Sequence, residues 1–286
     1  MDTLSPTAAR PPSLLDLSLP PGATPTGARH WTGRAQNFAV AWHHAGPAGT
    51  RPAFESADEA MLIVLDAAVG ISGAGRDAEA PARSICILPP GAWQLDLKPG
   101  ATCVVLSSLR EGVAAGALNE PAYAERDPRI APVGPAYRAL RSAGEPRIFS
   151  IDSIAAPKDK PRLKMLQTAT LSINWVEYEG PRDRHALSPH SHSSFEQGSL
   201  ALAGDFVHHL RVEWGQDADA WQDDQHARLG SPSLMVVPVH TIHTSEGVGP
   251  GRHLLIDVFS PPRADFIAKG WVANSGDYAA PEKAAA

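Results

Sequence analysis

Short apolar segments separated by proline and glycine limit the fold of this chain more than any other feature of its sequence. The 286 residues include 27 prolines and 24 glycines, and many of the segments between them are rich in β-branched residues. Such segments cover residues 60–71, 83–89, 102–109, 168–178, 199–204, 207–214, 233–239 and 253–260. Short strands that alternate with turns are typical of a β-sandwich or a β-barrel. We therefore predict an all-β chain with short helices only at 136–143 and 264–269.

The composition argues against several classes of function. The net charge of −6 and a pI near 6.0 give no basic face for nucleic acid. No stretch approaches 18 apolar residues, and the N-terminus lacks the pattern of a signal peptide. Cys86 and Cys103 both lie in apolar runs, which indicates buried free thiols rather than a disulfide. We expect a cytoplasmic protein that binds neither nucleic acid nor a membrane.

Composition also divides the chain into five regions. Residues 1–34 are rich in Pro, Ala and Thr and are predicted to form an N-terminal arm. The regions 35–110 and 165–275 carry strand segments in a similar order, which is a weak internal repeat. Between them, 111–164 contains many Pro and Arg residues and reads as a connecting segment, while 276–286 reads as a tail. The predicted organisation is two β-domains joined by a long connection.

The strongest chemical signal is the segment SPHSHSSFEQGSLALAG at 188–204. On a strand, His190 and His192 would point to the same face, so both imidazoles can meet at one point. Glu196 has the same parity, whereas Gln197 is out of phase unless a bulge or turn intervenes. The segment PVHTIHTSEG at 238–247 offers a third imidazole. Imidazoles with an added carboxylate or amide oxygen suit Fe, Mn or Ni, and imidazoles alone also suit Zn or Cu.

These two segments resemble the motifs of the cupin superfamily. The first motif is matched by His190-x-His192, four residues, Gln197, six residues and Gly204. The second is matched by Pro238-x-His240, two residues and His243. The resemblance implies one divalent metal held by His190, His192 and His243, with Gln197 or Glu196 as the fourth ligand.

The N-terminal half has the same spacing without the imidazoles. Pro89-x-Gly91 is followed by Gln94 in the position of the ligand histidine, and Pro52 and Phe54 occupy the two earlier histidine positions. The resemblance therefore implies two cupin barrels, double-stranded β-helices of the jelly-roll type. The first of them would keep the barrel without a metal.

Other residues near the motifs are candidates for substrate contact. His208 and Arg211 lie on the next predicted strand, and Arg211 could bind an anionic substrate, although a surface arginine fits the pattern equally well. Trp175 and Phe206 could line an aromatic-accepting cavity, with the barrel core as the alternative for the tryptophan. His240 stands beside the second motif and could add a further imidazole.

Three neutral imidazoles and a neutral amide would leave the metal its full charge of +2, and such a site is a strong Lewis acid. If Glu196 does not bind the metal, it would be a natural general base. The resemblance implies a non-haem Fe(II) dioxygenase acting on a small enolisable or hydroxyaromatic compound, with dioxygen as co-substrate. The alternative is a non-redox isomerase, lyase or hydrolase of a small carbonyl or sugar-acid substrate with Zn, Ni or Mn. A second alternative is a non-catalytic ligand-binding cupin, and a homodimer is expected in each case.

Overall fold

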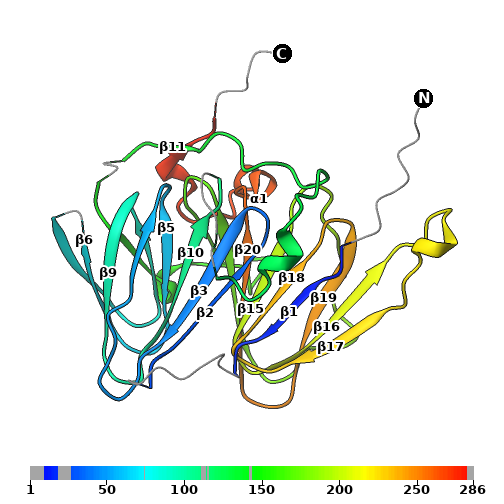
Figure 1. The fold of residues 1–286 in the computed structure, drawn as a ribbon, viewed down its shortest axis with the longest axis horizontal. Coiled ribbons are helices and arrows are strands. Elements are labelled where there is room, and N and C mark those ends of the chain that lie inside the picture. The colour runs from blue at the N-terminus through cyan, green and yellow to red at the C-terminus, as the bar shows by residue number, and fades with distance from the viewer. Residues whose placement is uncertain are drawn as a thin grey trace.

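The computed structural model describes residues 10–18, 27–73, 75–110, 114, 116–141 and 144–281. Parts of the predicted arm (1–9 and 19–26) and most of the predicted tail (282–286) lie outside the described residues. The described chain is mostly β, arranged in five sheets, and its one α-helix is α1 (Ala264–Ala268). Two β-barrels lie side by side, the N-terminal one blue to cyan and the C-terminal one green to orange (Figure 1). The predicted all-β fold is confirmed.

The N-terminal barrel consists of a six-stranded and a four-stranded sheet. The larger sheet has the order β12-β8-β5-β10-β3-β2 and the smaller β4-β9-β6-β7. Their bounds are β2 (Arg29–Arg34), β3 (Phe38–His44), β4 (Ala53–Ser56), β5 (Ala60–Val64), β6 (Val69–Gly73), β7 (Arg76–Ala80), β8 (Ser84–Leu88), β9 (Gly91–Leu97), β10 (Thr102–Ser108) and β12 (Arg147–Ser150).

The C-terminal barrel pairs another six-stranded sheet with a three-stranded one. The orders are β1-β18-β15-β20-β14-β13 and β17-β16-β19. Their bounds are β1 (Ser13–Asp16), β13 (Met165–Gln167), β14 (Ser172–Glu179), β15 (Gln197–Ala203), β16 (Asp205–Val212), β17 (Gln225–Leu229), β18 (Ser233–Val237), β19 (Thr241–Val248) and β20 (Arg252–Phe259). Short 3-10 turns complete the fold: η1 (Glu120–Tyr123), η2 (Ile151–Ser153), η3 (Ala218–Ala220) and η4 (Ser275–Asp277).

Two segments outside the predicted domains become strands of the large sheets. β1, in the predicted arm, pairs antiparallel with β18 of the C-terminal barrel, where it appears as the dark blue strand of the right-hand barrel (Figure 1). β12, in the predicted connecting segment, pairs with β8 of the N-terminal barrel. The arm thus crosses from the first barrel to the second.

The two large sheets are buried on both faces, which explains their continuous apolar runs. One face of each builds the core shared by the barrels, to which β5 contributes Met61 and Ile63 and β20 contributes Ile256 and Val258. Along each strand of these sheets, the residues that alternate with the shared-core residues face the interior of their own barrel. In the N-terminal barrel this interior is apolar, filled by side chains such as Leu62, Val64, Ile71, Trp93, Leu95 and Cys103.

The interior of the C-terminal barrel is more polar. Strands β15, β16, β19 and β20 bury polar side chains, among them Gln197, Ser199, His208, His243 and Asp257. Buried polar groups cost free energy unless they are paired, so their concentration in the C-terminal barrel makes its interior the candidate site.

Two local predictions have opposite outcomes. The helix predicted at 136–143 is wrong, because residues 138–139 form strand β11 (Arg138–Ala139) with β21 (Tyr278–Ala279). The amides of Tyr137 and Leu140 donate to carbonyls of other segments and not to a helix turn. The helix predicted at 264–269 is confirmed by α1, and Cys86 and Cys103 are buried free thiols as predicted. In the described residues no helix has the length and apolarity to span a membrane.

Candidate metal centre

Three imidazoles converge in the C-terminal barrel. His190 forms a two-way backbone bridge with His243, with N–O distances of 3.1 and 2.8 Å. The rings of His190, His192 and His243 have centroids 4.5 to 5.2 Å apart. One ring nitrogen from each lies within 4.8 Å of the others, and among the described residues this is the one group of three that could hold a metal ion. The structure therefore brings together the histidines of the two predicted segments.

The hydrogen bonds of two rings direct their Nε2 atoms at the centre. Nδ1 of His190 lies 2.9 Å from the carbonyl of Ser188, and Nδ1 of His243 lies 2.9 Å from that of Thr241. A carbonyl only accepts, so each Nδ1 carries the proton and each Nε2 presents a lone pair. Nε2 of His243 is buried and has no hydrogen-bond partner among the described residues. A buried imidazole nitrogen without a partner, with its tautomer fixed from behind, fits a metal ligand.

Burial also keeps two of the imidazoles neutral. Desolvation lowers the pKa of His192 to about 4 and the pKa of His243 to about 3. Metal ions bind the neutral imidazole, so near neutral pH protons compete little for these nitrogens. Both rings are therefore neutral at physiological pH, and that of His243 presents its Nε2 lone pair to the centre.

Gln197 adds an amide oxygen beside the imidazoles. Its Oε1 lies 2.9 Å from Nε2 of His192, while its Nε2 donates to Ser199 Oγ and to Asp257 Oδ1, both at 3.1 Å. These two donations direct the oxygen toward the histidine cluster. The donor set is three neutral imidazoles and one neutral amide, which is compatible with Fe, Mn or Ni.

A turn decides between Gln197 and Glu196. The backbone bends at residues 193–194, and β15 begins only at Gln197. The alternation of side chains along β15 therefore starts at Gln197 and does not continue from His190 and His192. Glu196 is 3% exposed and accepts hydrogen bonds from the amide of Gln36 at 2.7 Å and from the hydroxyl of Tyr123 at 3.0 Å. Burial raises the pKa of this carboxyl group. The assignments of Glu196 as a metal ligand and as the general base are therefore wrong, because both its oxygens tie the C-terminal barrel to the N-terminal half.

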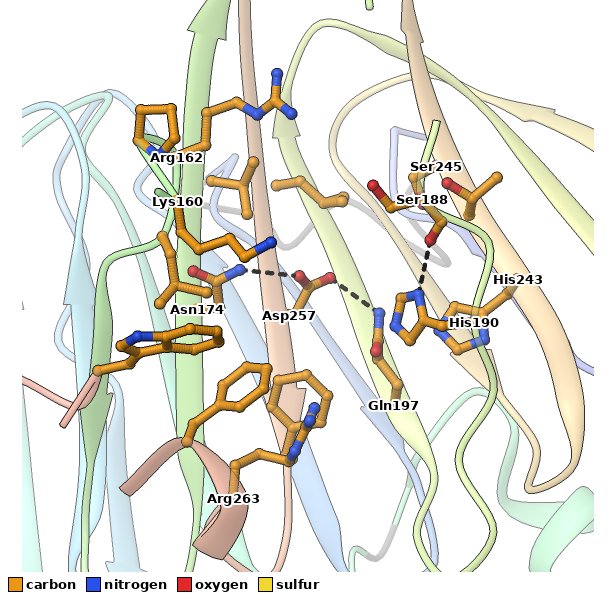
Figure 2. A pocket seen from close by; sticks show the side chains of 18 of the residues that line it. Lys160, Arg162, Asn174, Ser188, His190, Gln197, His243, Ser245, Asp257 and Arg263 are labelled. Carbon is orange, nitrogen blue, oxygen red and sulfur yellow. Dashed lines mark hydrogen bonds between the residues drawn. The ribbon is translucent and has the colours of Figure 1, made fainter. Parts of the chain in front are cut away.

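Asp257 is the residue of the site that sequence reasoning missed. Its Oδ1 accepts from Gln197 and from Ser199 at 3.3 Å, and its Oδ2 accepts from Asn174 at 3.4 Å. Burial raises its pKa to about 6. Dashed lines in Figure 2 mark the hydrogen bond from Asn174 to Asp257 and the hydrogen bond from Gln197 to Asp257. The available signal was a charged residue inside the otherwise apolar strand HLLIDVFS.

The imidazoles open on a cavity of about 390 Å³, which suits a small molecule. His190, Gln197 and His243 form one side of its lining, shown on the right in Figure 2. Apolar walls come from Val176, Leu255, Phe259, Phe266 and Trp271, and cationic side chains come from Lys160, Arg162, Arg182 and Arg263. A molecule in this cavity would meet lone pairs on one side and positive charge and aromatic rings on the others.

The residues predicted to contact substrate lie outside this lining. Arg211 pairs with Asp224 and lines a second pocket, of about 550 Å³, which His190 and His243 also line, so its contact with substrate stays a prediction. Trp175 points from β14 into the core shared by the barrels, opposite to its cavity-lining neighbours Asn174 and Val176, so this assignment is wrong. His240 is exposed and has a left-handed φ of 62°; its amide, not its ring, contacts the site by donating to the carbonyl of His192.

Phe206 and His208 lie within the barrel but do not line the cavity. Phe206 packs in an apolar cluster with Ala201 and Leu255. Nδ1 of His208 lies 2.8 Å from Oγ of Ser245, which does line the cavity. His208 is therefore connected to the cavity through one hydroxyl group.

Asp257→Asn is expected to weaken metal binding by about 10–100-fold, the usual effect of losing a partner that orients a ligand. The wild-type carboxylate accepts from three donors, whereas an asparagine amide would turn an NH₂ group toward one of them. Gln197 would then lose its fixed orientation. Titration of the metal-free protein with Zn²⁺, Ni²⁺ or Fe²⁺ measures the change. Unchanged affinity would show that the carboxylate does not position the amide.

By sequence, no protein-family model and no curated protein matches the chain. By structure, the two barrels and their order define the fold of a bicupin. Three solved structures illustrate the likeness. AerE from Microcystis aeruginosa is 9% identical with a TM-score of 0.56, over 88% of this chain and 98% of its own. Oxalate decarboxylase from Lactobacillus farciminis is 13% identical with a TM-score of 0.56, over 92% of this chain and 88% of its own. A putative glyoxylate induced protein from Pseudomonas aeruginosa is 14% identical with a TM-score of 0.52, over 91% of both chains.

Proposed function

We propose that the C-terminal barrel is the active site of a metal-dependent enzyme acting on a small molecule bound in the cavity. The observation that carries this proposal is the buried Nε2 of His243, which lies at the cavity wall without a partner among the described residues and close to the imidazoles of His190 and His192. A divalent ion bound there would act as a Lewis acid toward a carbonyl or enol oxygen. Asp257 would hold Gln197 in place.

The reaction that we put first is that of a non-haem Fe(II) dioxygenase on a small enolisable or hydroxyaromatic compound. Two features support it. Three protein imidazoles would leave coordination positions for a substrate and dioxygen. The adjoining walls of Phe259, Phe266 and Trp271 suit an aromatic or planar substrate.

The second candidate is a non-redox isomerase, lyase or hydrolase. It is favoured by the fourth position of the site, where a neutral amide and not a carboxylate lies beside the imidazoles. Such a site would keep the full charge of the ion for polarising a substrate oxygen, and this chemistry requires no dioxygen. The cytoplasmic location and the homodimer stay predictions.

Metal analysis and oxygen uptake test the proposal. We expect about one metal ion per chain, and Fe(II)-loaded protein is expected to consume oxygen with at least one member of a panel of β-diketones, catechols and hydroxyaromatic acids. The exposed variant Arg228→Gln, outside the cavity lining, should behave as wild type. Turnover without oxygen uptake, with Zn, Ni or Mn bound, would establish the second candidate. Metal binding without any turnover would leave a ligand-binding protein, and no metal binding would overturn the proposal.

A further inference from the structure

The cavity carries an excess of positive charge away from the imidazoles. Its lining contains four cationic side chains, Lys160, Arg162, Arg182 and Arg263, and two carboxylates, Asp159 and Asp257. Asp257 is buried and occupied by three donors. Charge in a cavity with low-dielectric walls acts over a longer range than on an open surface, so this excess favours an anion.

Three of the cations have no carboxylate partner. Arg263 is paired with Asp265 at 2.8 Å, as structural arginines usually are. In contrast, Lys160, Arg162 and Arg182 make no ion pair within the part of the chain that the structure describes. Lys160 and Arg162 stand in the upper part of the cavity in Figure 2, away from the histidines. Arg182 also donates to the carbonyl of Ala186 at 3.4 Å, but no carboxylate neutralises any of the three charges within the described residues.

Two of the guanidinium groups gather at one aromatic ring. Their Cζ atoms lie 5.8 and 5.9 Å from the ring centroid of Tyr178, for Arg162 and Arg182 respectively. Partial burial and the neighbouring charge of Arg182 lower the pKa of Arg162. Two like charges held together in this way repel each other, and an oxyanion between them would remove that cost.

Backbone hydrogen bonds fix the chain segments that carry Lys160 and Arg182. The amide of Lys160 donates to the carbonyl of Pro157, and the amide of Leu163 donates to that of Lys160, both at 2.9 Å. The amide of Arg182 donates to the carbonyl of Gly247 on β19, the strand that also carries His243. Arg182, at the cationic end of the cavity, is therefore hydrogen-bonded through its backbone to the strand that carries His243.

We infer that the cavity binds a small organic acid, whose carboxylate or phosphate group is held by Arg162 and Arg182 with Lys160 nearby, and whose other end reaches the metal centre. This inference rests on the proposed function for the role of the metal end. The oxyanion group distinguishes the substrate from a neutral diketone or catechol. Bidentate arginine contacts would fix its orientation relative to the imidazoles.

Calorimetric titration of the chelator-treated protein with inorganic phosphate, succinate and neutral succinamide tests the inference. We expect phosphate or succinate to bind and succinamide not to bind. The double variant Arg162→Gln/Arg182→Gln should lose at least about 10-fold in affinity, because hydrogen bonds to charged groups are lost. The exposed control Arg228→Gln should match wild type. Whichever anion binds more tightly identifies the group.

Three results would overturn the inference: no binding of either anion, equal binding of succinamide, or wild-type affinity in the double variant. The test is independent of the metal because it is also carried out in His243→Ala. Anion binding that persists in His243→Ala would show that the anion site does not need the metal, and anion binding by a wild-type protein that binds no metal would refute the proposed enzyme while keeping the anion site. Metal binding without anion binding would refute the anion site while keeping the proposed enzyme.

Discussion

His243→Ala is expected to abolish stoichiometric metal binding while both barrels stay folded. The substitution removes one of three converging imidazoles, and the nitrogen that it removes has no other partner among the described residues. Since loss of an orienting partner alone costs 10–100-fold in affinity, loss of a ligand is expected to cost more than about 100-fold. Metal content after purification and titration of the metal-free protein measure the effect, and far-UV circular dichroism follows the fold. His192→Ala is expected to behave in the same way.

The matched control is His240→Asn, three residues from His243 in sequence. Its ring is exposed and outside the cavity lining, and asparagine accepts the left-handed backbone at this position. This variant is expected to keep one metal ion per chain. If His192→Ala and His243→Ala both retained a full equivalent of metal, the site would not be the one described.

Trp175→Ala is expected to lower the free energy of unfolding by roughly 3–5 kcal/mol, the range for removing a buried aromatic side chain. The indole is 1% exposed in the core between the two large sheets. Its N–H donates to Glu177 at 3.1 Å, and that carboxylate also pairs with Arg83 and Arg252. The substitution therefore leaves a cavity and removes one donor from a partly exposed ion-pair cluster. Urea denaturation measures the change.

Trp214→Ala serves as the control for this effect. Trp214 is 66% exposed, so its removal is expected to change stability by less than about 1 kcal/mol. The less drastic Trp175→Phe keeps the aromatic ring and should fall between wild type and alanine. A Trp175→Ala variant as stable as wild type would show that the shared core does not hold the barrels together.

Much of the fold was predictable because its strands are buried on both faces. Runs such as 60–71 and 233–239 contain β5 and β18, and turn residues bound them. The crossing of the arm was not predictable, because β1 is only Ser13–Asp16 and its pairing depends on an edge formed more than 200 residues later. Strand β11 was missed for a related reason, since its partner β21 lies at the other end of the chain.

The candidate metal centre was predictable as far as local spacing determines it. His190, His192 and His243 lie in two short segments with fixed spacing, and the structure brings them together. The choice between Glu196 and Gln197 depended on a turn whose position the sequence leaves open. Lys160, Arg162 and Arg182 could not be assigned because they lie in loops with no periodic pattern, and only the folded chain gathers them around one cavity.

The crossing strand makes the two halves of this chain inseparable. β18 is flanked by β15 on one side and by β1 on the other. Three residues after β18 the chain reaches His240, and then the candidate ligand His243. A polypeptide that began at the second barrel would expose the backbone groups of β18 on its outer side, and such an open edge invites association with other chains. A cut between the barrels is therefore expected to destabilise the domain that carries the candidate metal centre, because the N-terminal residues complete its wall.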